Sequence, residues 1–395
     1  MSKKYNFDEY VNRKNTASFK WDGNMEYFGK EDIIPMWVAD MDFKCAEPIQ
    51  EAVRERAHHP IYGYSIRTDN YLNAVLHWLR RKHNFEVEKE WITFTPPGVI
   101  YAVYTMIQIL TEKNNSVIIQ SPNYDPLFDI VKKTGRKLVI NRLQYKNNKY
   151  TLDFEDLEEK ISQGAKAIIL SNPNNPTGRV WKKWELEKLG NLCLKNNVFV
   201  IVDEIYSDFI FKGNSHIPFA SINENFAENS MLCYSTNKGF NLGGLQMSTI
   251  IIPSEKLRNK FNEVMRVTQT RLDNIFGAVA LEAAYTKCDD WLEQVIDYVH
   301  SNKKYIIDYF NEKIPRLKVV DSEGTFLLWI DCTALNMCCE DLERFFIDKA
   351  GIAFSQGYEF GQEGKGFVRM NIACPISTIK KALMQLEKAI HELEK

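Results

Sequence analysis

The sequence lacks the long apolar run that a membrane-spanning helix requires, since none of its hydrophobic stretches reaches about 18 residues. The residues from Met1 to Tyr5 include two lysines with no apolar core behind them, so we expect no signal peptide. Positive charge is not in excess either. The formal net charge is -2, whereas a broad nucleic-acid surface needs clustered Lys and Arg. These absences predict a cytoplasmic protein with neither a membrane nor a nucleic acid as partner.

Metal-binding patterns are also missing, although the chain contains eight cysteines. The cysteines are scattered, none forms a CxxC pair, and the adjacent Cys338 and Cys339 are poorly spaced for a tetrahedral metal site. No low-complexity tract or repeat of fixed period occurs. We therefore predict that the protein holds no metal ion and works in a reducing compartment.

Short β-branched runs alternate with helical patterns through the first two thirds of the chain. The 395 residues, of which 45% are hydrophobic, are enough for two or three domains with real cores. Near-continuous apolar runs suit strands that are covered on both faces of a sheet. This pattern predicts an α/β fold with a mostly parallel sheet. The expected strands are residues 116–120, 167–170, 198–202 and 249–252, and a helix is expected over 184–195.

The pattern changes after about residue 280, where a long helix is expected. We predict that this part forms a second, smaller α/β domain. Its expected helices are residues 290–313, 341–349 and 375–394, and its expected strands are 324–330 and 367–372.

We expect three segments in the domain organisation. Residues 46–285 form the large domain, and residues 286–395 form the small carboxyl-terminal domain. Residues 1–45 have a mixed pattern, and we expect them to pack with the small domain and at a dimer interface. In an open α/β sheet, ligands bind outside the carboxyl ends of the strands, so polar residues at such ends are candidates for a site.

Gly98 and Tyr124 are the first such candidates. Gly98 opens an apolar helical run, and a glycine there leaves backbone N–H groups accessible to an anion such as a phosphate. The alternative is a simple loop-to-helix cap. Tyr124 follows a predicted strand and could stack on a planar ring, although a buried core tyrosine explains the position equally well.

Asn175 lies in a segment that two Asn-Pro pairs and Gly178 force into an extended turn. An asparagine held there can donate a hydrogen bond to a ring oxygen, and the alternative is an ordinary turn. Asp203 ends an apolar strand, where a carboxylate is costly unless a cation or hydrogen bonds compensate it. A protonated pyridine nitrogen is one such cation, and an internal Lys or Arg is the alternative.

Lys238 and Arg369 are the candidate cations. Lys238 lies in a Gly- and Asn-rich stretch, where a desolvated lysine has a lowered pKa and can form a Schiff base. Ser235, three residues earlier, could bind a phosphate. A surface loop lysine is the alternative for Lys238. Arg369 interrupts an apolar strand and suits a substrate carboxylate, and an intramolecular ion pair explains it equally well.

The order of these residues resembles that in fold-type I enzymes dependent on pyridoxal 5'-phosphate (PLP), and the chain resembles the class I/II aminotransferase superfamily over nearly its whole length. One branch fits best: residues 35–43, PMWVADMDF, look like the signature of the MalY/PatB-type C–S lyases. Residues 178–181, 240–246 and 369–375 are also similar to that branch. The resemblance implies the type I PLP-dependent transferase fold, with a large domain built on a mostly parallel seven-stranded sheet and a smaller α/β domain.

The resemblance also implies roles for individual residues. Lys238 would carry the cofactor, Asp203 would pair with its pyridine nitrogen, and Arg369 would bind the substrate α-carboxylate. The other cofactor-binding residues would be Tyr206 and Asn175 at the ring hydroxyl oxygen, Tyr124 stacked on the ring, and Ser235 with the N–H groups of Gly98, Val99 and Ile100 at the phosphate. Tyr64 would reach the phosphate from a partner subunit, and Trp37, Ala39 and Asp40 would line the substrate side.

Two features depart from the branch. Thr236-Asn237-Lys238-Gly239 stands where Pro-Ser-Lys-Thr is expected, and Tyr206 stands where histidine is expected. Tyrosine there is usual in the aminotransferase branches. Gln246 lies where many aminotransferases place a phosphate-binding arginine, and its presence favours the lyase branch.

The implied reaction is β-elimination from L-cystathionine or a related L-cysteine S-conjugate, giving pyruvate, ammonia and a thiol. Lys238 would act as the general base, supported by Asp203 and Tyr206 as the other catalytic residues. An aminotransferase that uses a 2-oxo acid is the main alternative, because Tyr206 suits it. A PLP-binding regulatory protein that acts through a protein partner is the alternative from another class. The shared site implies a homodimer at least.

Overall fold

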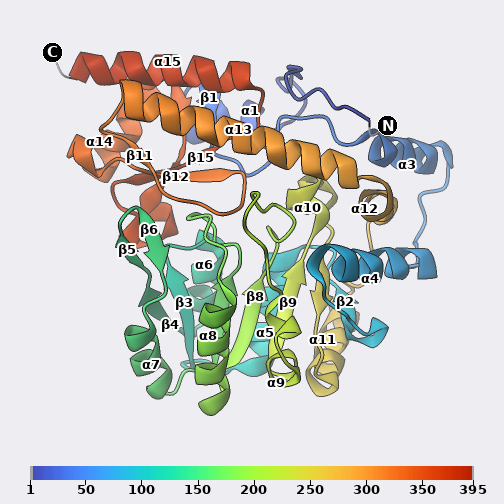
Figure 1. Cartoon of the computed structure of the whole chain (residues 1–395). Helices are drawn as coiled ribbons and strands as arrows, with labels where there is room; N and C mark the ends of the chain where they lie inside the picture. Colours follow the sequence, from blue (N-terminus) through green and yellow to red (C-terminus); the bar gives the residue numbers. More distant parts are fainter. Residues whose placement is uncertain (1–2, 394–395) are drawn as a thin grey trace.

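The computed structural model describes residues 3–393. The start of the amino-terminal segment at Met1 and the predicted helix end at Glu394 lie outside the described residues. A seven-stranded sheet forms the centre of the large layer (Figure 1), in the order β2-β10-β9-β8-β7-β3-β4. The strands are β2 (Ile92–Phe94), β3 (Ser116–Ser121), β4 (Lys137–Arg142), β7 (Ala167–Ser171), β8 (Phe199–Asp203), β9 (Ser230–Tyr234) and β10 (Thr249–Ile251).

The predicted mostly parallel sheet is confirmed, with one antiparallel strand. Strand β10 runs antiparallel to both of its neighbours, β2 and β9, and the other neighbouring pairs are parallel. Every residue of β7 and β8 is buried. Successive side chains of a strand point to opposite faces, so one strand contributes to two apolar cores. Ile168 and Leu170 pack into one core, and Ala167 and Ile169 pack into the other.

Helices cover both faces of this sheet. Side chains of α5 (Val99–Leu110), α6 (Asp125–Lys133) and α11 (Glu255–Val267) enter the core on one face. The larger core on the opposite face also holds residues of the helices that connect the two layers. The other helices and strands of the large layer are α3 (Glu47–His58), α4 (Asp69–His83), β5 (Gln144–Lys146), β6 (Lys149–Thr151), α7 (Phe154–Ser162), α8 (Lys183–Lys195), α9 (Glu224–Glu228), α10 (Thr236–Gly239) and α12 (Ile275–Lys287).

The carboxyl-terminal part contains a four-stranded antiparallel sheet in the order β11-β12-β15-β14. The long helix α13 passes this sheet, and the carboxyl-terminal helix α15 lies beside it (Figure 1). The elements are α13 (Asp289–Lys313), β11 (Lys318–Val319), β12 (Leu327–Asp331), α14 (Cys339–Arg344), β13 (Ile352–Ala353), β14 (Ser355–Gln356), β15 (Phe367–Asn371) and α15 (Ile376–Leu393).

Two of the predicted elements in this part differ in extent. The strand expected from residue 324 begins at Leu327, because Thr325 has a positive φ of 67° that interrupts an extended chain. The helix expected over 341–349 is α-helical only to Arg344 and continues as a π-helix over Phe345–Ala350.

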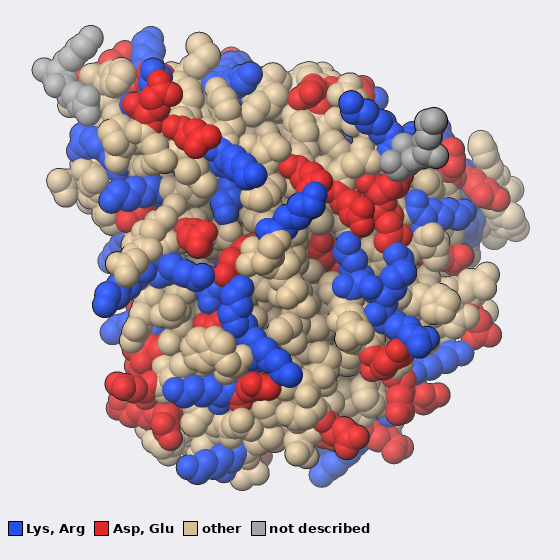
Figure 2. All heavy atoms as spheres, viewed as in Figure 1, with Lys and Arg blue, Asp and Glu red and all other residues tan. Residues whose placement is uncertain are grey.

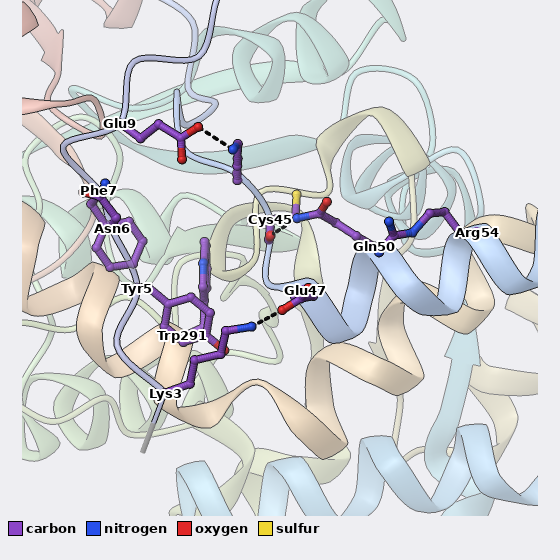
Figure 3. Close-up of a pocket in the computed structure, with 11 residues that line it drawn as sticks. Lys3, Tyr5, Asn6, Phe7, Glu9, Cys45, Glu47, Gln50, Arg54 and Trp291 are labelled. Atoms are coloured by element: carbon purple, nitrogen blue, oxygen red, sulfur yellow. Dashed lines mark hydrogen bonds and ion pairs between the residues drawn. The ribbon is translucent and has the colours of Figure 1, made fainter. Parts of the chain in front are cut away.

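The amino-terminal segment crosses from the large layer to the carboxyl-terminal one. After the short helices α1 (Phe19–Asp22) and α2 (Asn24–Phe28), strand β1 (Ile34–Pro35) pairs in parallel with β13. Near its start, Lys3 forms an ion pair with Glu47 of α3, and Glu9 forms one with Lys44 (Figure 3). Further along, Asn371 of β15 donates to the main-chain oxygens of Val38 and Asp40, and Lys238 of α10 donates to that of Ala39, so residues 38–40 lie between the two layers.

The surface carries both signs of charge. Figure 2 shows Lys and Arg interspersed with Asp and Glu over the viewed face, consistent with the net charge of -2. Within residues 3–393, no helix is both long and apolar enough to cross a membrane.

Candidate active site

A cavity of about 430 Å³ lies at the carboxyl ends of the parallel strands. Its walls come from segments far apart in the sequence: the end of β8, the start of α5, the α10 turn, β15 and the segment after β1. Eleven of the residues predicted for the site line it: Trp37, Ala39, Gly98, Val99, Ile100, Tyr124, Asn175, Asp203, Tyr206, Lys238 and Arg369.

Lys238 lies on the short helix α10, which the Ser235 side chain caps. Burial, followed by the nearby positive charge of Arg369, lowers the pKa of the Lys238 ammonium to about 8. Its Nζ donates a hydrogen bond of 2.7 Å to the main-chain oxygen of Ala39. No described carboxylate forms an ion pair with it, so a substantial fraction of this amine is neutral and nucleophilic near pH 8.

Asp203 is the last residue of β8 and is only 7% exposed. Burial raises the pKa of its carboxyl group to about 6, although the N–H of Ile205 donates to it at 3.2 Å and the charge of Lys238 acts in the opposite direction. No described cation forms an ion pair with this carboxylate within 4.0 Å. An internal Lys or Arg partner, the alternative drawn from the sequence, is therefore absent among residues 3–393.

Arg369 is 6% exposed on β15, and all of its hydrogen-bond acceptors are neutral. Nη2 donates to the main-chain oxygen of Trp37 at 2.7 Å and to Ser355 Oγ at 2.9 Å, and Nη1 donates to Asn175 Oδ1 at 3.0 Å. Its Nε has no partner in the described chain. The intramolecular ion pair considered above does not form within residues 3–393, so the guanidinium keeps its charge available for a carboxylate.

Tyr206 and Asn175 present polar groups beside these charges. The Tyr206 hydroxyl is buried and has no hydrogen-bond partner among the described residues, and its ring lies 5.8 Å from Lys238 Nζ. Buried hydroxyls nearly always form a hydrogen bond, so the Tyr206 hydroxyl is available to a ligand that can donate or accept one. Because Asn175 Oδ1 already accepts from Arg369, its amide nitrogen is the atom left to donate.

Gly98 precedes α5 with φ of 105°, a conformation that side chains rarely tolerate. No side chain caps this helix. The first N–H groups of α5, on Val99 and Ile100, therefore face the cavity without intrahelical acceptors. Free N–H groups at the positive end of a helix dipole form a site for a phosphate group.

Three predicted residues do not reach the cavity of their own chain. The Ser235 hydroxyl accepts from the Asn237 N–H at 3.1 Å and donates to the Met247 carbonyl, so its hydrogen bonds serve the α10 turn. The Asp40 carboxylate forms an ion pair of 2.6 Å with Arg13. The Tyr64 side chain is 93% exposed on a loop.

The cavity also contains residues that the sequence did not single out. Ser355 contacts Arg369 because β14 pairs with β15 in a register that places the two residues opposite each other. Phe19 of α1 joins Trp37 on the wall. No local motif marks either residue, because both arrive through tertiary pairing of distant segments.

Comparison with known families identifies the chain. Residues 32–386 match the family model for aminotransferase class I and II. The chain belongs to this family. The resemblance found in the sequence is thus confirmed, and the site described above is that of a class I and II aminotransferase family member.

Its relatives include C–S lyases. Cystathionine beta-lyase PatB of Bacillus subtilis is 38% identical over 386 residues, which cover 98% of this chain and 100% of the relative. The crystal structure of cystalysin from Treponema denticola, which contains pyridoxal 5'-phosphate, has a TM-score of 0.96 and 35% identity, covering 99% of this chain and 100% of that one. The PLP-bound C–S lyase of Staphylococcus hominis has a TM-score of 0.92 and 31% identity, covering 98% of both chains.

Proposed function

We propose that this family member is a PLP-dependent C–S β-lyase that converts L-cystathionine or a related L-cysteine S-conjugate to pyruvate, ammonia and a thiol. One observation carries the proposal: the cavity brings together Lys238, Asp203 and Arg369, three charged side chains with no ion-pair partner among the described residues. The names of the relatives support this choice within the family.

The residues present fit the cofactor. Asp203 would hold its pyridinium nitrogen, because an adjacent positive charge repays the cost of a buried carboxylate. Tyr206 and Asn175 would hydrogen-bond its ring oxygen with the groups that lack partners here. The N–H groups of Val99 and Ile100 would hold its phosphate. Tyr124, which lines the cavity, would stack on the ring.

The chain's own residues perform the remaining chemistry. When bound, PLP supplies an electron sink for the negative charge left at Cα. Arg369 fixes the substrate α-carboxylate with its terminal nitrogens. Lys238, whose lowered pKa leaves much of the amine neutral, removes the Cα proton as the Cβ–S bond weakens. The resulting Lys238 ammonium can return a proton to the departing sulfur, which leaves as a thiol. Water then hydrolyses the released three-carbon enamine to pyruvate and ammonia.

We also propose that the protein is a cytoplasmic homodimer with the domain division 46–285 and 286–395. Ile61, Tyr62, Tyr64 and Ile66 are 66%, 61%, 93% and 84% exposed, an unusual concentration of apolar surface for a monomer. Burying this loop against a second copy would remove that surface from water. Tyr64 could then reach the phosphate of the partner's site.

A pyruvate assay tests the reaction. The cofactor-loaded protein is supplied with L-cystathionine without any 2-oxo acid, and we expect pyruvate, ammonia and thiol in equal amounts. Turnover only after 2-oxoglutarate is added would instead identify an aminotransferase, the activity that Tyr206 favours. That outcome would overturn the proposed β-elimination but keep the cofactor site.

A further inference from the structure

Three aromatic rings gather around that of Trp37 at the mouth of the cavity. The ring centre of Trp37 lies 5.0 Å from those of Phe19 and Tyr27 and 5.2 Å from that of Phe28. We call these four residues the aromatic rim. Phe19 and Trp37 line the cavity, and Phe19 and Tyr27 are 54% and 50% exposed, so ring faces remain open to a ligand.

The aromatic rim is fixed relative to the carboxylate-binding residue. The main-chain oxygen of Trp37 accepts hydrogen bonds from Arg369 Nη2 at 2.7 Å and from Ser355 Oγ at 3.0 Å. Its indole Nε1 donates to the main-chain oxygen of Lys20 at 3.3 Å, and the Lys20 ammonium forms a buried ion pair of 2.7 Å with Asp42. A substrate whose α-carboxylate is bound by Arg369 therefore has the rim close to its side chain.

The cavity wall offers no further charge to a distal group of the substrate. Its only charged side chains among the described residues are Asp203, Lys238 and Arg369, each of which already has a role at the cofactor or the α-carboxylate. The loop at residues 60–66, which the proposed dimer would bring from a second copy, contains no charged residue. A second ammonium and carboxylate, as in cystathionine, would find no charged partner on this wall, which favours substrates with an uncharged group beyond the sulfur.

We propose that the aromatic rim selects L-cysteine conjugates whose sulfur carries an aryl or bulky apolar group. The inference rests on the proposed β-lyase activity and narrows its substrate class. An apolar ring stacked against Phe19 and Trp37 gains both the removal of apolar surface from water and the geometric preference of aromatic pairs. Truncating one ring of the rim should weaken such stacking by about tenfold.

The test compares three substrates of the holoenzyme that differ only beyond sulfur: S-phenyl-, S-methyl- and S-(2-aminoethyl)-L-cysteine. We expect the highest kcat/KM for the phenyl conjugate. Phe19→Ala should lower that value about tenfold and lower the value for the methyl conjugate less, because a methyl group has no ring to stack. Trp184→Ala, which removes an aromatic ring that is 60% exposed on α8, is the matched control and should change neither.

Preference for the aminoethyl conjugate would overturn the proposal, since it would mean that the rings bind a cation instead. Equal losses for all three substrates in Phe19→Ala would also overturn it. If no conjugate yields pyruvate, the proposed lyase activity fails, and the rim is then tested by calorimetry. L-Homophenylalanine, the sulfur-free analogue of the phenyl conjugate, should bind the holoenzyme about tenfold more tightly than L-norvaline, with the difference lost in Phe19→Ala. Equal affinities for the two amino acids would contradict the proposed role of the aromatic rim in binding.

Discussion

Two buried arginines in this protein have opposite surroundings. Arg179, 2% exposed, donates to both carboxylate oxygens of Glu185 at 3.0 Å and also forms an ion pair with Glu323. Arg369, 6% exposed, has only neutral acceptors in the described part of the chain. A charge that is paired within the chain holds the fold together, whereas a buried charge left unpaired costs stability and marks a place where a ligand supplies the partner.

The largest effect is expected for Lys238, the other unpaired cation of the cavity. Lys238→Ala removes both the nucleophile and the proton acceptor, so elimination should fall by at least about a thousandfold. Pyruvate release and the visible absorbance of the cofactor-loaded protein measure the loss, and circular dichroism checks the fold. Substantial remaining activity would show that another residue carries the chemistry.

The two arginines themselves should respond in opposite ways to the same substitution. Arg179→Met leaves Glu185 and Glu323 buried without their cation and should destabilise the protein by about 3–5 kcal/mol. Arg369→Met removes a charge without such a partner. It should change stability little, while kcat/KM falls roughly a hundredfold through the lost α-carboxylate contact.

Urea unfolding and steady-state kinetics on both variants separate these effects. Comparable destabilisation by the two substitutions would remove the distinction between paired and unpaired charges. A wild-type enzyme that turned over a substrate and its carboxamide equally well would contradict the role of Arg369.

The same comparison applies to Asp203, a carboxylate with no ion-pair partner among the described residues. The pH dependence of the protein's stability tests it. Its ordinary pKa of 3.8 is raised to about 6 by burial. The folded protein therefore binds more protons than the unfolded one between these values, and without cofactor its stability falls as the pH rises from about 4 to about 6. Asn cannot ionise, so cofactor-free Asp203→Asn should be more stable at pH 7, by up to about 3 kcal/mol, although less active.

Chemical denaturation of both proteins without cofactor, from about pH 4 to pH 7, gives the comparison. Identical pH profiles would mean that Asp203 is not the source of the dependence.

The smallest effect concerns Glu359, whose charge acts on Arg369 from outside the cavity wall. Burial raises the pKa of the Glu359 carboxyl to about 7. As Glu359 ionises with rising pH, it partly offsets the attraction of Arg369 for a substrate carboxylate. KM should therefore rise through neutral pH by less than about fivefold, and Glu359→Gln should remove that rise. A rise that persists in the variant would assign it to another group.

Some of this site could be predicted from the chain alone. Asp203 ends an apolar run and Arg369 interrupts one, and these runs indicate both the strands and the polar groups that are costly to bury in them. Whether such a charged residue belongs to a ligand site or to an internal ion pair depends on which side chains lie beside it in the folded protein. Arg179 follows a Pro-Thr-Gly turn and Arg369 interrupts an apolar strand, and only the fold shows that Glu185 and Glu323 face the first and Ser355 the second.

Other features depended on tertiary pairing that no local pattern encodes. The antiparallel direction of β10 is not encoded in its composition, which resembles that of the parallel strands of the same sheet. Asp40 was expected at the substrate, but Arg13, 27 positions earlier, binds its carboxylate. The hydroxyl of Ser235 was expected at a phosphate, and the Met247 carbonyl accepts from it in this structure.

The segment after β1 holds both cationic groups of the cavity in the same manner. Arg369 donates to the carbonyl of Trp37 and Lys238 donates to the carbonyl of Ala39, each at 2.7 Å. The main-chain oxygens of Trp37 and Ala39 are uncharged. Each accepts a hydrogen bond from its cation but attracts it less than a carboxylate would. An arriving ligand can therefore take over either group by exchange, without first having to break an ion pair.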